Sequence, residues 1–322
     1  MSKDRMRNST RIEGLLYQHA LEKRVTGENS AHPGTEYIRG TVDVATDDAL
    51  LNVITVHYTY VTATTKKGTP NELYTNLSNI LNGTLGCVMD VGAEHAAKVR
   101  LDSSVGVNDF YSDRNGVEEL VSAKRNEGGF LRTTNTLSPK EEDRSTFDCD
   151  MIITGVRHME ADESRGYADR AVVSGYVFDF RKAILPVDFT ALNPGAIRYF
   201  ENLNATEENP VFTRVRGQQV SNTVTRQYTV ESAFGDPVVR ESTSSRKDFV
   251  ITWAQPEEYM WNDPSTFTAD ELKEAQQNRE IHLAEVKSRS MMSQDSGNAF
   301  TSTAPAQSTA PARPATKLEF DF

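Results

Sequence analysis

Apolar side chains recur in two parts of the chain in the same order. Residues 171–180 and 184–189 carry two runs of β-branched and aromatic side chains, a composition typical of strands. A Pro-Gly break, a helical pattern over residues 196–203 and a further apolar run at 211–215 follow. The same succession of strand, strand, short helix and strand is found earlier, at residues 37–44, 53–61, 71–81 and 98–105. The pattern therefore predicts two β domains built in the same way.

This succession is typical of a small Greek-key barrel such as the OB-fold. We expect a mainly β fold class, with two OB-like Greek-key barrels, short helices, a C-terminal helix and a disordered tail. A polar segment with a proline separates the two barrels and is typical of a linker. The expected domains are residues 1–30 (N-terminal helix), 31–136 (first barrel), 137–146 (linker), 147–262 (second barrel), 263–290 (C-terminal helix) and 291–322 (tail).

Two capping patterns predict where the terminal helices begin. Thr10 is followed three residues later by Glu13, and Ile12, Leu15, Leu16 and His19 recur at helical spacing, which predicts a helix over about residues 11–25. Thr268 and Glu271 form the same pattern before the C-terminal helix. The apolar stripe of that second helix is thin, so we expect it to be exposed or to use a partner.

Composition limits the partners of the protein. The formal net charge is −11, which argues against a generally basic surface for nucleic acid, so an anion-binding surface has to be a local patch. Cys87 and Cys149 lie far apart and are expected to be reduced thiols in a cytoplasmic protein. We find neither a secretory signal nor the run of roughly 18 apolar residues that spans a membrane.

Cations and aromatic rings are interleaved in residues 98–133, and a smaller basic excess follows in the second barrel. A protein that binds single strands needs cations for phosphates and rings for bases, since stacking contributes about 1–3 kcal/mol per base. The candidates in the first barrel are Tyr58, Tyr60, Arg100, Phe110, Tyr111, Lys124, Arg125, Phe130 and Arg132. Those in the second barrel are Tyr176, Phe178, Arg214, Arg216 and Arg226.

The alternative for each candidate is that its ring belongs to the core and its charge to an ordinary surface. We assign Trp253 to the core of the second barrel, and Arg5, Arg7 and Arg11 to a frayed terminus. The glycines at positions 128 and 129 are expected to let the backbone approach a ligand.

Residues after Ser290 are mainly Ser, Thr, Ala, Pro and Gln, a composition that predicts disorder. The chain ends in Leu318, Glu319, Phe320, Asp321 and Phe322, whose carboxylates and rings suit a basic, apolar pocket of a partner protein. In this organisation the chain resembles bacterial single-stranded DNA-binding proteins, which combine an OB-fold core, a flexible linker and an acidic tip ending in Phe. With two barrels in one chain, it is similar to proteins of this kind encoded by bacteriophages. The resemblance implies that the tip recruits replication or recombination proteins.

Motifs for catalysis are absent from the sequence: we find no phosphate-binding loop, dinucleotide fingerprint, zinc-protease helix or nucleophile elbow. We therefore expect a non-catalytic protein without cofactor or metal that acts on single-stranded DNA in replication or recombination. Its expected location is the cytoplasm, which would be the host's cytoplasm if a phage encodes the chain. The sequence leaves open whether the protein forms homo-oligomers. The alternatives are a virion assembly protein made of self-packing β domains, and a metal-dependent nuclease at Asp148 and Asp150.

Overall fold

The computed structural model describes residues 6–114, 117–162, 167–230, 238–256, 258–263 and 266–295. The strands are β1 (Asn8–His19), β2 (Glu22–Val25), β3 (Glu36–Ala45), β4 (Val53–Thr62), β5 (Lys98–Arg114), β6 (Val117–Thr133), β7 (Ser145–Met159), β8 (Arg170–Phe178), β9 (Ile184–Ala191), β10 (Val211–Val230) and β11 (Val238–Ala254). The helices are α1 (Glu72–Leu81), α2 (Val88–Val91), α3 (Pro194–Asn202), α4 (Ala269–Asp295) and the 3-10 helix η1 (Glu141–Asp143).

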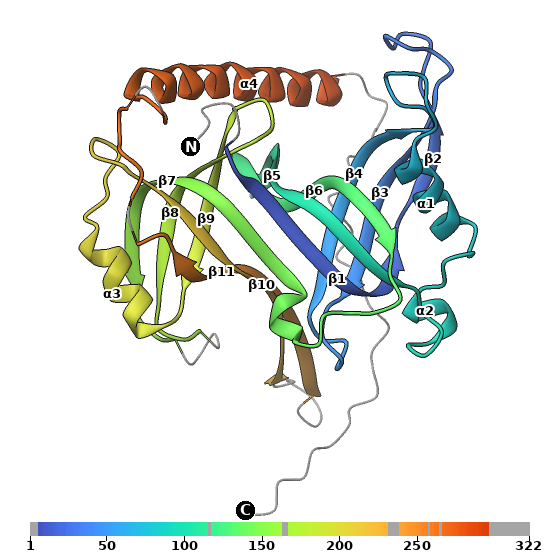
Figure 1. Ribbon diagram of the computed structural model, residues 1–322, viewed down its shortest axis with the longest axis horizontal. Helices are drawn as coiled ribbons and strands as arrows, with labels where there is room; N and C mark the ends of the chain where they lie inside the picture. Colours follow the sequence, from blue (N-terminus) through green and yellow to red (C-terminus); the bar gives the residue numbers. More distant parts are fainter. Residues whose placement is uncertain are drawn as a thin grey trace, which may run out of the picture.

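Strand pairing closes the sheet into two five-stranded rings (Figure 1). In barrel 1, β1 pairs with β3, β3 with β4, β4 in parallel with β6, β6 with β5, and β5 with β1. In barrel 2, β7, β8, β9, β11 and β10 follow in the same order, again with one parallel pair, and β10 returns to β7. In chain order, a helix lies between the third and fourth strands of each barrel: α1 between β4 and β5, and α3 between β9 and β10. The mainly β fold with two OB-like barrels is therefore confirmed.

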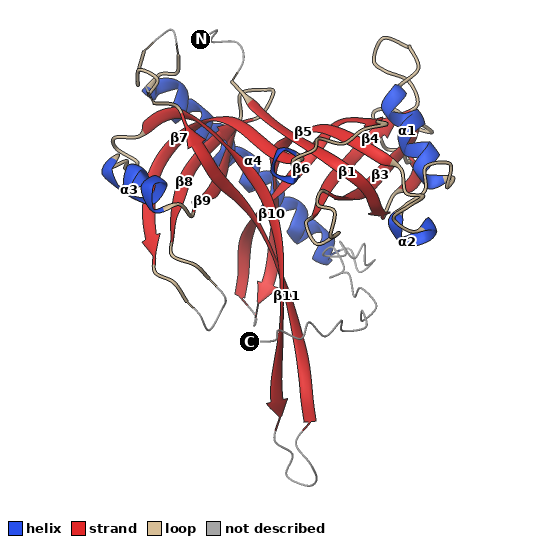
Figure 2. Cartoon of the chain, turned by 60° about the horizontal axis from the view of Figure 1, so that its bottom comes forward, coloured by secondary structure: helices blue, strands red, loops and turns tan. Residues whose placement is uncertain are grey.

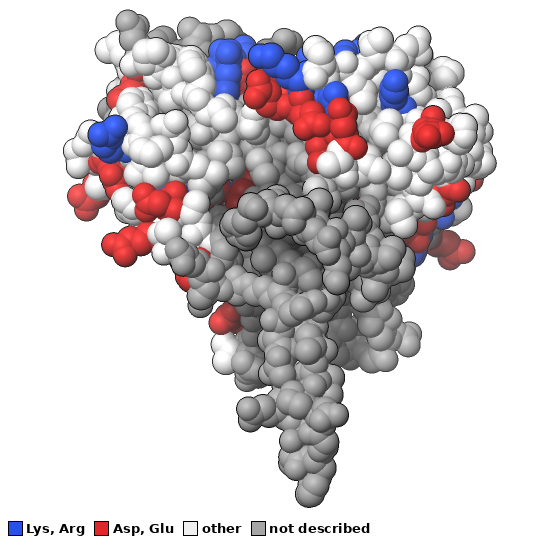
Figure 3. Space-filling model, turned by 90° about the horizontal axis from the view of Figure 1, so that it is seen from below, with Lys and Arg blue, Asp and Glu red and all other residues white. Residues whose placement is uncertain are grey.

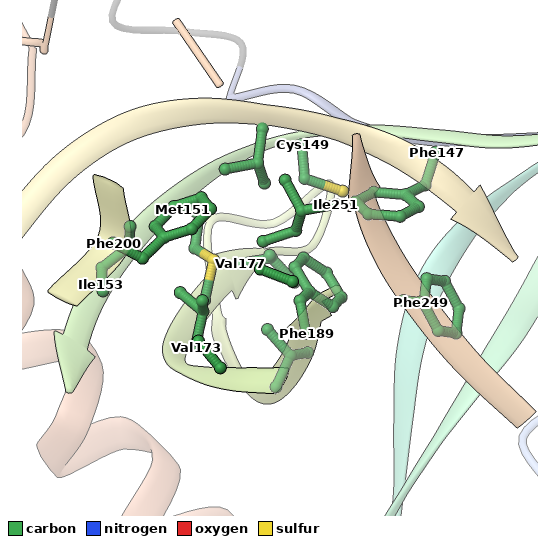
Figure 4. Packing of buried hydrophobic residues seen from close by; sticks show 14 of the residues in the cluster. Phe147, Cys149, Met151, Ile153, Val173, Val177, Phe189, Phe200, Phe249 and Ile251 are labelled. Atoms are coloured by element: carbon green, nitrogen blue, oxygen red, sulfur yellow. The ribbon is translucent and has the colours of Figure 1, made fainter. Parts of the chain in front are cut away.

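Each barrel is filled by side chains that alternate along its strands. Ile12, Leu16, Val42, Val56 and Leu101 are fully buried in barrel 1. Figure 4 shows the corresponding core of barrel 2, where Phe147, Cys149 and Met151 of β7 point toward side chains of β8, β9 and β11. The two cores are separate clusters, so each barrel has an apolar interior of its own.

The N-terminal helix expected from the sequence is wrong, because residues 8–19 form β1. Thr10, Ile12 and Leu16 face the interior, at the two-residue period of a strand. A Cβ on Gly14 would lie 1.9 Å from the carbonyl oxygen of Ala45, so β3 passes where only glycine fits. Glu13 does not cap a helix; its carboxylate is buried and binds Arg100.

The first strands of the two barrels pair with each other, in antiparallel register from Asn8 with Cys149 to Ile12 with Ser145. Six strands consequently lie side by side in the order β6, β5, β1, β7, β10 and β11. We call the outer side of these six strands the joint face. It runs without interruption from one barrel to the other.

The two long hairpins, β5–β6 and β10–β11, each contact the opposite barrel, and β10 and β11 also project beyond both barrels (Figure 2). Lys124 of β6 donates to the carbonyl oxygen of Asp188 on β9. Lys247 of β11 donates to the hydroxyl of Thr55 on β4 over 2.7 Å. The side-chain amide of Asn126 on β6 donates to Oε1 of Gln219 on β10 over 2.7 Å. Each hairpin thus occupies part of the outward side of the other barrel's third strand.

Helix α4 confirms the expected C-terminal helix and runs along both barrels (Figure 1). Its capping box is formed, since the Glu271 amide donates to Thr268 Oγ1 over 3.2 Å and the Thr268 amide to Glu271 Oε2 over 2.9 Å. Leu272 packs in an apolar cluster outside barrel 2, and Arg279 binds Asp109 of the β5–β6 hairpin over 2.7 Å. Within the described ranges, none of the helices is long and apolar enough to cross a membrane.

Candidate nucleic-acid interface

The joint face collects polar and aromatic side chains from all six of its strands. They project outward because their sequence neighbours, such as Ile12, Leu101, Cys149 and Val215, point into the two cores. The residues of this face used below are Arg7 at the start of β1, Arg11 and Glu13 (β1), Arg100 and Asp102 (β5), Phe130 and Arg132 (β6), Asp148 (β7), Arg214 and Arg216 (β10) and Trp253 (β11).

On barrel 1 the arginines surround Glu13, whose side chain is fully buried. Arg100 binds this carboxylate through two nitrogens, at 2.9 and 2.8 Å, and Arg11 lies 3.4 Å away. The Ser138 amide also donates to it. Burial alone would raise the pKa of Glu13, but the Ser138 amide and Arg100 outweigh burial and lower it. Beside this cluster, Arg132 forms an ion pair with Asp102.

On barrel 2 the corresponding acid is Asp148, and 23% of its side chain is exposed. Arg214 binds it with two nitrogens, one of them Nε at 2.6 Å, while Arg7 and Arg216 lie at 3.1 and 3.3 Å. Burial raises the pKa of Asp148, but hydrogen bonds from Arg214 and Arg7 outweigh burial and leave it below its usual value.

One exposed aromatic ring lies on the last strand of each barrel. Phe130 on β6 is 63% exposed and pairs with Asp102; Trp253 on β11 is 40% exposed and pairs with Arg216. In both hairpins the register shifts directly after that partner, so the rings occupy matching positions. The guanidinium of Arg216 lies 4.8 Å from the centre of the Trp253 ring, in a cation–π contact.

The joint face is basic although the chain is acidic. Among the described residues named above, six arginines meet the three carboxylates of Glu13, Asp102 and Asp148, whereas the whole chain has a net charge of −11. In the view from below, blue and red side chains lie next to each other along the upper edge of the molecule (Figure 3). The joint face is therefore a local cationic patch, which is the form that an anion-binding surface has to take on an acidic protein.

Five of the candidates taken from the sequence meet on this face: Arg100, Phe130, Arg132, Arg214 and Arg216. Two others cannot stack on a base, because Tyr58 is 3% exposed in the core of barrel 1 and Phe178 is fully buried beside Phe267. Burial also raises the pKa of Tyr58. Phe178 is covered because the segment around Phe267 packs on the outside of barrel 2.

The remaining candidates lie away from the joint face or take part in contacts between elements. Lys124 lies 4.9 Å from the Phe249 ring and Arg125 binds Glu127 at 2.7 Å. The charge of Arg125 adds to burial in lowering the pKa of His57 to about 4. Lys287 of α4 lies over Tyr111, Tyr176 packs in the cluster outside barrel 2, Phe110 is half-buried on β5, and Tyr60 is exposed beside Tyr37.

Some of the residues predicted from the sequence lie outside what the structure describes. Arg226 is placed on β10 opposite Ser242, but its side chain is not described. The tail with its tip at Leu318, Glu319, Phe320, Asp321 and Phe322 also lies outside the described residues.

Sequence reasoning missed three residues of the face. Arg11 lies on β1 and Arg7 directly precedes it, and the signal for this strand was the alternation of Thr10 and Ile12 with polar neighbours. Trp253 points outward and does not belong to the core. Gly129 has another role than expected: a Cβ on it would lie 1.9 Å from the Asp102 carbonyl oxygen, because its backbone approaches β5.

The two aspartates considered as a nuclease site are engaged with other side chains. Asp148 holds the arginines described above. Asp150 accepts hydrogen bonds from the Arg7 amide at 2.7 Å and from Tyr259 at 3.1 Å, and burial raises its pKa. Across the part of the chain that the structure describes, no three His, Cys, Asp or Glu residues are grouped for a metal ion.

A protein-family model described as YorF matches residues 7–289. No curated protein sequence matches the chain. Two solved structures of the single-stranded DNA binding protein from Thermus aquaticus are similar to it. A deletion variant is 10% identical with a TM-score of 0.43, covering 81% of this chain and 98% of its own. The wild type is 9% identical with a TM-score of 0.42, covering 80% and 94%.

Proposed function

The chain belongs to the YorF family, and we propose that it binds single-stranded DNA along the joint face without catalysing a reaction on it. The observation that carries the proposal is the matching pair of exposed rings, Phe130 and Trp253, at the two ends of an arginine-rich face. Rings stack on any base and arginines neutralise phosphates, so the combination suits an unpaired strand of any sequence.

The arginines keep donors for phosphate although each is paired. A guanidinium has five N–H donors in a fixed fork, and an ion pair with one carboxylate uses at most two. Arg216 is 48% exposed and Arg132 is 61% exposed on their side chains, so their remaining donors face solvent. The acids therefore hold the arginines in position while the strand binds to their outer side.

The width of the face sets a minimum length for the DNA. Neighbouring strands lie about 4.8 Å apart, so β6 and β11 are about 24 Å apart across the sheet. An oligonucleotide that reaches only one ring loses the stacking contribution of the other. Affinity should therefore rise with length until both rings are in contact.

The finer parts of the proposal follow from the function and from the sequence. We place the protein in replication or recombination in the cytoplasm, or in the host's cytoplasm if a bacteriophage encodes it. Residues 318–322 recruit its partner proteins, because an acidic and aromatic segment suits a basic apolar pocket. No observation on the described residues favours the alternative of a self-packing virion protein.

The test is a titration of a fluorescent single strand of about thirty nucleotides, which is about the length that two OB-folds cover. We expect tight binding that weakens as salt rises, and weak competition by duplex of the same sequence. Phe130→Ala combined with Trp253→Ala should weaken binding by about 2–6 kcal/mol, since each ring contributes about 1–3.

The matched control is Tyr60→Ala, which removes an exposed ring of barrel 1 that lies off the joint face. We expect this variant to bind like the wild type. Binding that is insensitive to salt, or that responds to Tyr60→Ala and not to the double substitution, would contradict the proposed face.

A further inference from the structure

One helix packs on the core of each barrel from the side. In barrel 2 this helix is α3, whose Ile197 and Phe200 are buried in the barrel core. In barrel 1 it is α1, whose Leu77 and Ile80 are buried in the same way. Figure 1 shows α3 beside barrel 2 and α1 beside barrel 1. The two helices are equivalent, so the polar contacts that hold them can be compared.

His158 joins α3 to two strands of barrel 2. It lies near the end of β7, and its Nδ1 is 2.6 Å from Oε1 of Glu201 on α3. Its Nε2 is 2.7 Å from Oδ1 of Asp169, the residue directly before β8. A single imidazole ring thus connects β7, the start of β8 and α3. We call these three residues the His158 clasp.

Both ring nitrogens can hold their carboxylates only when the ring is doubly protonated. An ionised carboxylate accepts hydrogen bonds and donates none, so each ring nitrogen has to carry a proton to bind one. A neutral imidazole has a single N–H, and its other nitrogen directs a lone pair at the carboxylate. Loss of one proton therefore breaks one of the two contacts and replaces it with repulsion.

The charges around the imidazole come from the elements packed against it. Asp169 lies on the side of β8 and Glu201 on the side of α3. Arg170 begins β8, but its guanidinium lies 4.3 Å from the ring centre of Tyr167. Arg198 precedes Glu201 by three residues on α3 and is exposed. Among the described residues, the charged groups in contact with the imidazole are therefore the two carboxylates.

The clasp responds to pH near neutrality. Hydrogen bonds to Asp169 and Glu201 raise the pKa of His158 above its usual value of 6.5. The contribution of the clasp is therefore fully present below pH 6.5 and is lost as pH rises through this raised pKa. The side chain of His158 is 42% exposed, so its proton exchanges with solvent while the barrel stays closed.

The equivalent helix of barrel 1 is held by groups that keep their protons. The side-chain amide of Asn76 on α1 donates to the Leu131 carbonyl oxygen of β6 over 2.8 Å, and an amide does not titrate. The Tyr74 hydroxyl on α1 donates to Glu36 of β3, and this bond raises the pKa of Tyr74 above its usual value of 10. These contacts do not change between about pH 6 and 8.5, so α1 is an internal control for α3.

We propose that His158 is a pH-operated clasp, in which the doubly protonated ring holds α3 against barrel 2 and the neutral ring releases the end of the helix. Glu201 lies in the last turn of α3, so the release begins at the end that leads to β10. Openings of this kind occur locally, without unfolding of the whole domain. The inference is independent of nucleic-acid binding.

The charge of the ring is tested by an NMR titration of the histidine signals in the full chain. The midpoint of His158 should lie above pH 6.5, and Asp169→Asn and Glu201→Gln should each lower it. Glu207→Gln is the matched control, because it removes one negative charge from an exposed position shortly after α3. It should leave the midpoint unchanged. A wild-type midpoint at or below 6.5, or an equal shift in the control, would overturn the proposal.

The release of the helix is tested by amide hydrogen exchange, corrected for the chemical exchange rate at each pH. Between about pH 6 and 8.5 the amides of α3 should lose protection, while those of α1 should keep it. In His158→Gln the protection of α3 should be weak at both pH values, because glutamine does not titrate. The clasp is refuted if both helices respond equally to pH, or if α3 keeps its pH response in His158→Gln.

Discussion

The two barrels place an acid on their first strand and an arginine on their fourth, yet the surroundings of the acid differ. In barrel 1 Glu13 binds Arg100 and its side chain is fully buried. In barrel 2 Asp148 binds Arg214 and 23% of its side chain is exposed. The same charge pair therefore serves the fold in one barrel and remains accessible to a ligand in the other.

The difference comes from the segment between the barrels. The Ser138 amide donates to Glu13, and the Glu13 amide donates to the Arg144 carbonyl oxygen over 2.7 Å, so residues 138–144 cover this acid. Asp148 instead binds the largely buried Arg214 together with Arg7 and Arg216, whose side chains are about half exposed, and Arg216 lies against Trp253. We expect the Glu13 cluster to contribute mainly to stability and the Asp148 cluster mainly to DNA binding.

The largest expected effect is on stability. Glu13→Gln leaves Arg100 without a charged partner beside a buried site, which should cost about 3 kcal/mol of unfolding free energy. Asp148→Asn acts on a more exposed cluster and should cost about 1 kcal/mol. Urea unfolding followed by circular dichroism measures both. Equal losses would show that the two clusters do not differ in the way their burial indicates.

The pH dependence of unfolding sharpens the same comparison. The pKa of Glu13 is lowered in the folded state, so its contribution is present above the usual value of 4.5 and is lost as pH falls below it. The pKa of Asp148 is also lowered, from a usual value of 3.8, and its contribution is lost at lower pH. Glu13→Gln should therefore flatten the loss of stability that begins near pH 4.5.

The two barrels could be predicted from the sequence because apolar and polar residues alternate regularly along their strands. The prediction failed where tertiary contacts override a local pattern. Glu13 resembled a helix cap because a capping box is defined by spacing, whereas its partner Arg100 is far away in the chain. Phe178 resembled a surface ring because nothing in its own strand predicts that the segment around Phe267 covers it.

The outward orientation of Trp253 on the joint face results from a one-residue irregularity in β11. Phe249 and Ile251 are buried, so alternation predicts that Trp253 is buried as well. The register shifts between Arg216 and Gly217, where Gly217 pairs with Ile251 and Arg216 with Trp253, and this bulge turns the ring outward. A bulge has no reliable sequence signature, so the main ring of the proposed site could not be predicted from the residues alone.

The second expected effect compares the rings. Trp253→Ala should weaken binding of the fluorescent single strand more than Phe130→Ala, with both losses within about 1–3 kcal/mol. Trp253 has the larger ring and is supported by Arg216 at 4.8 Å, whereas the partner residue of Phe130 is an aspartate. The reverse order would assign the dominant contact to barrel 1.

The smallest effect separates the arginines by their salt dependence. Each phosphate contact on a single strand contributes about 0.7 to the slope of log affinity against log salt. Arg216 is 48% exposed, so Arg216→Ala should lower the slope by about that amount. Arg100 is directed toward the buried Glu13, so Arg100→Ala should lower stability and change the slope less. A slope that falls equally in both variants would mean that the strand reaches the Glu13 cluster, and that burial of the acid does not keep its arginine from phosphate.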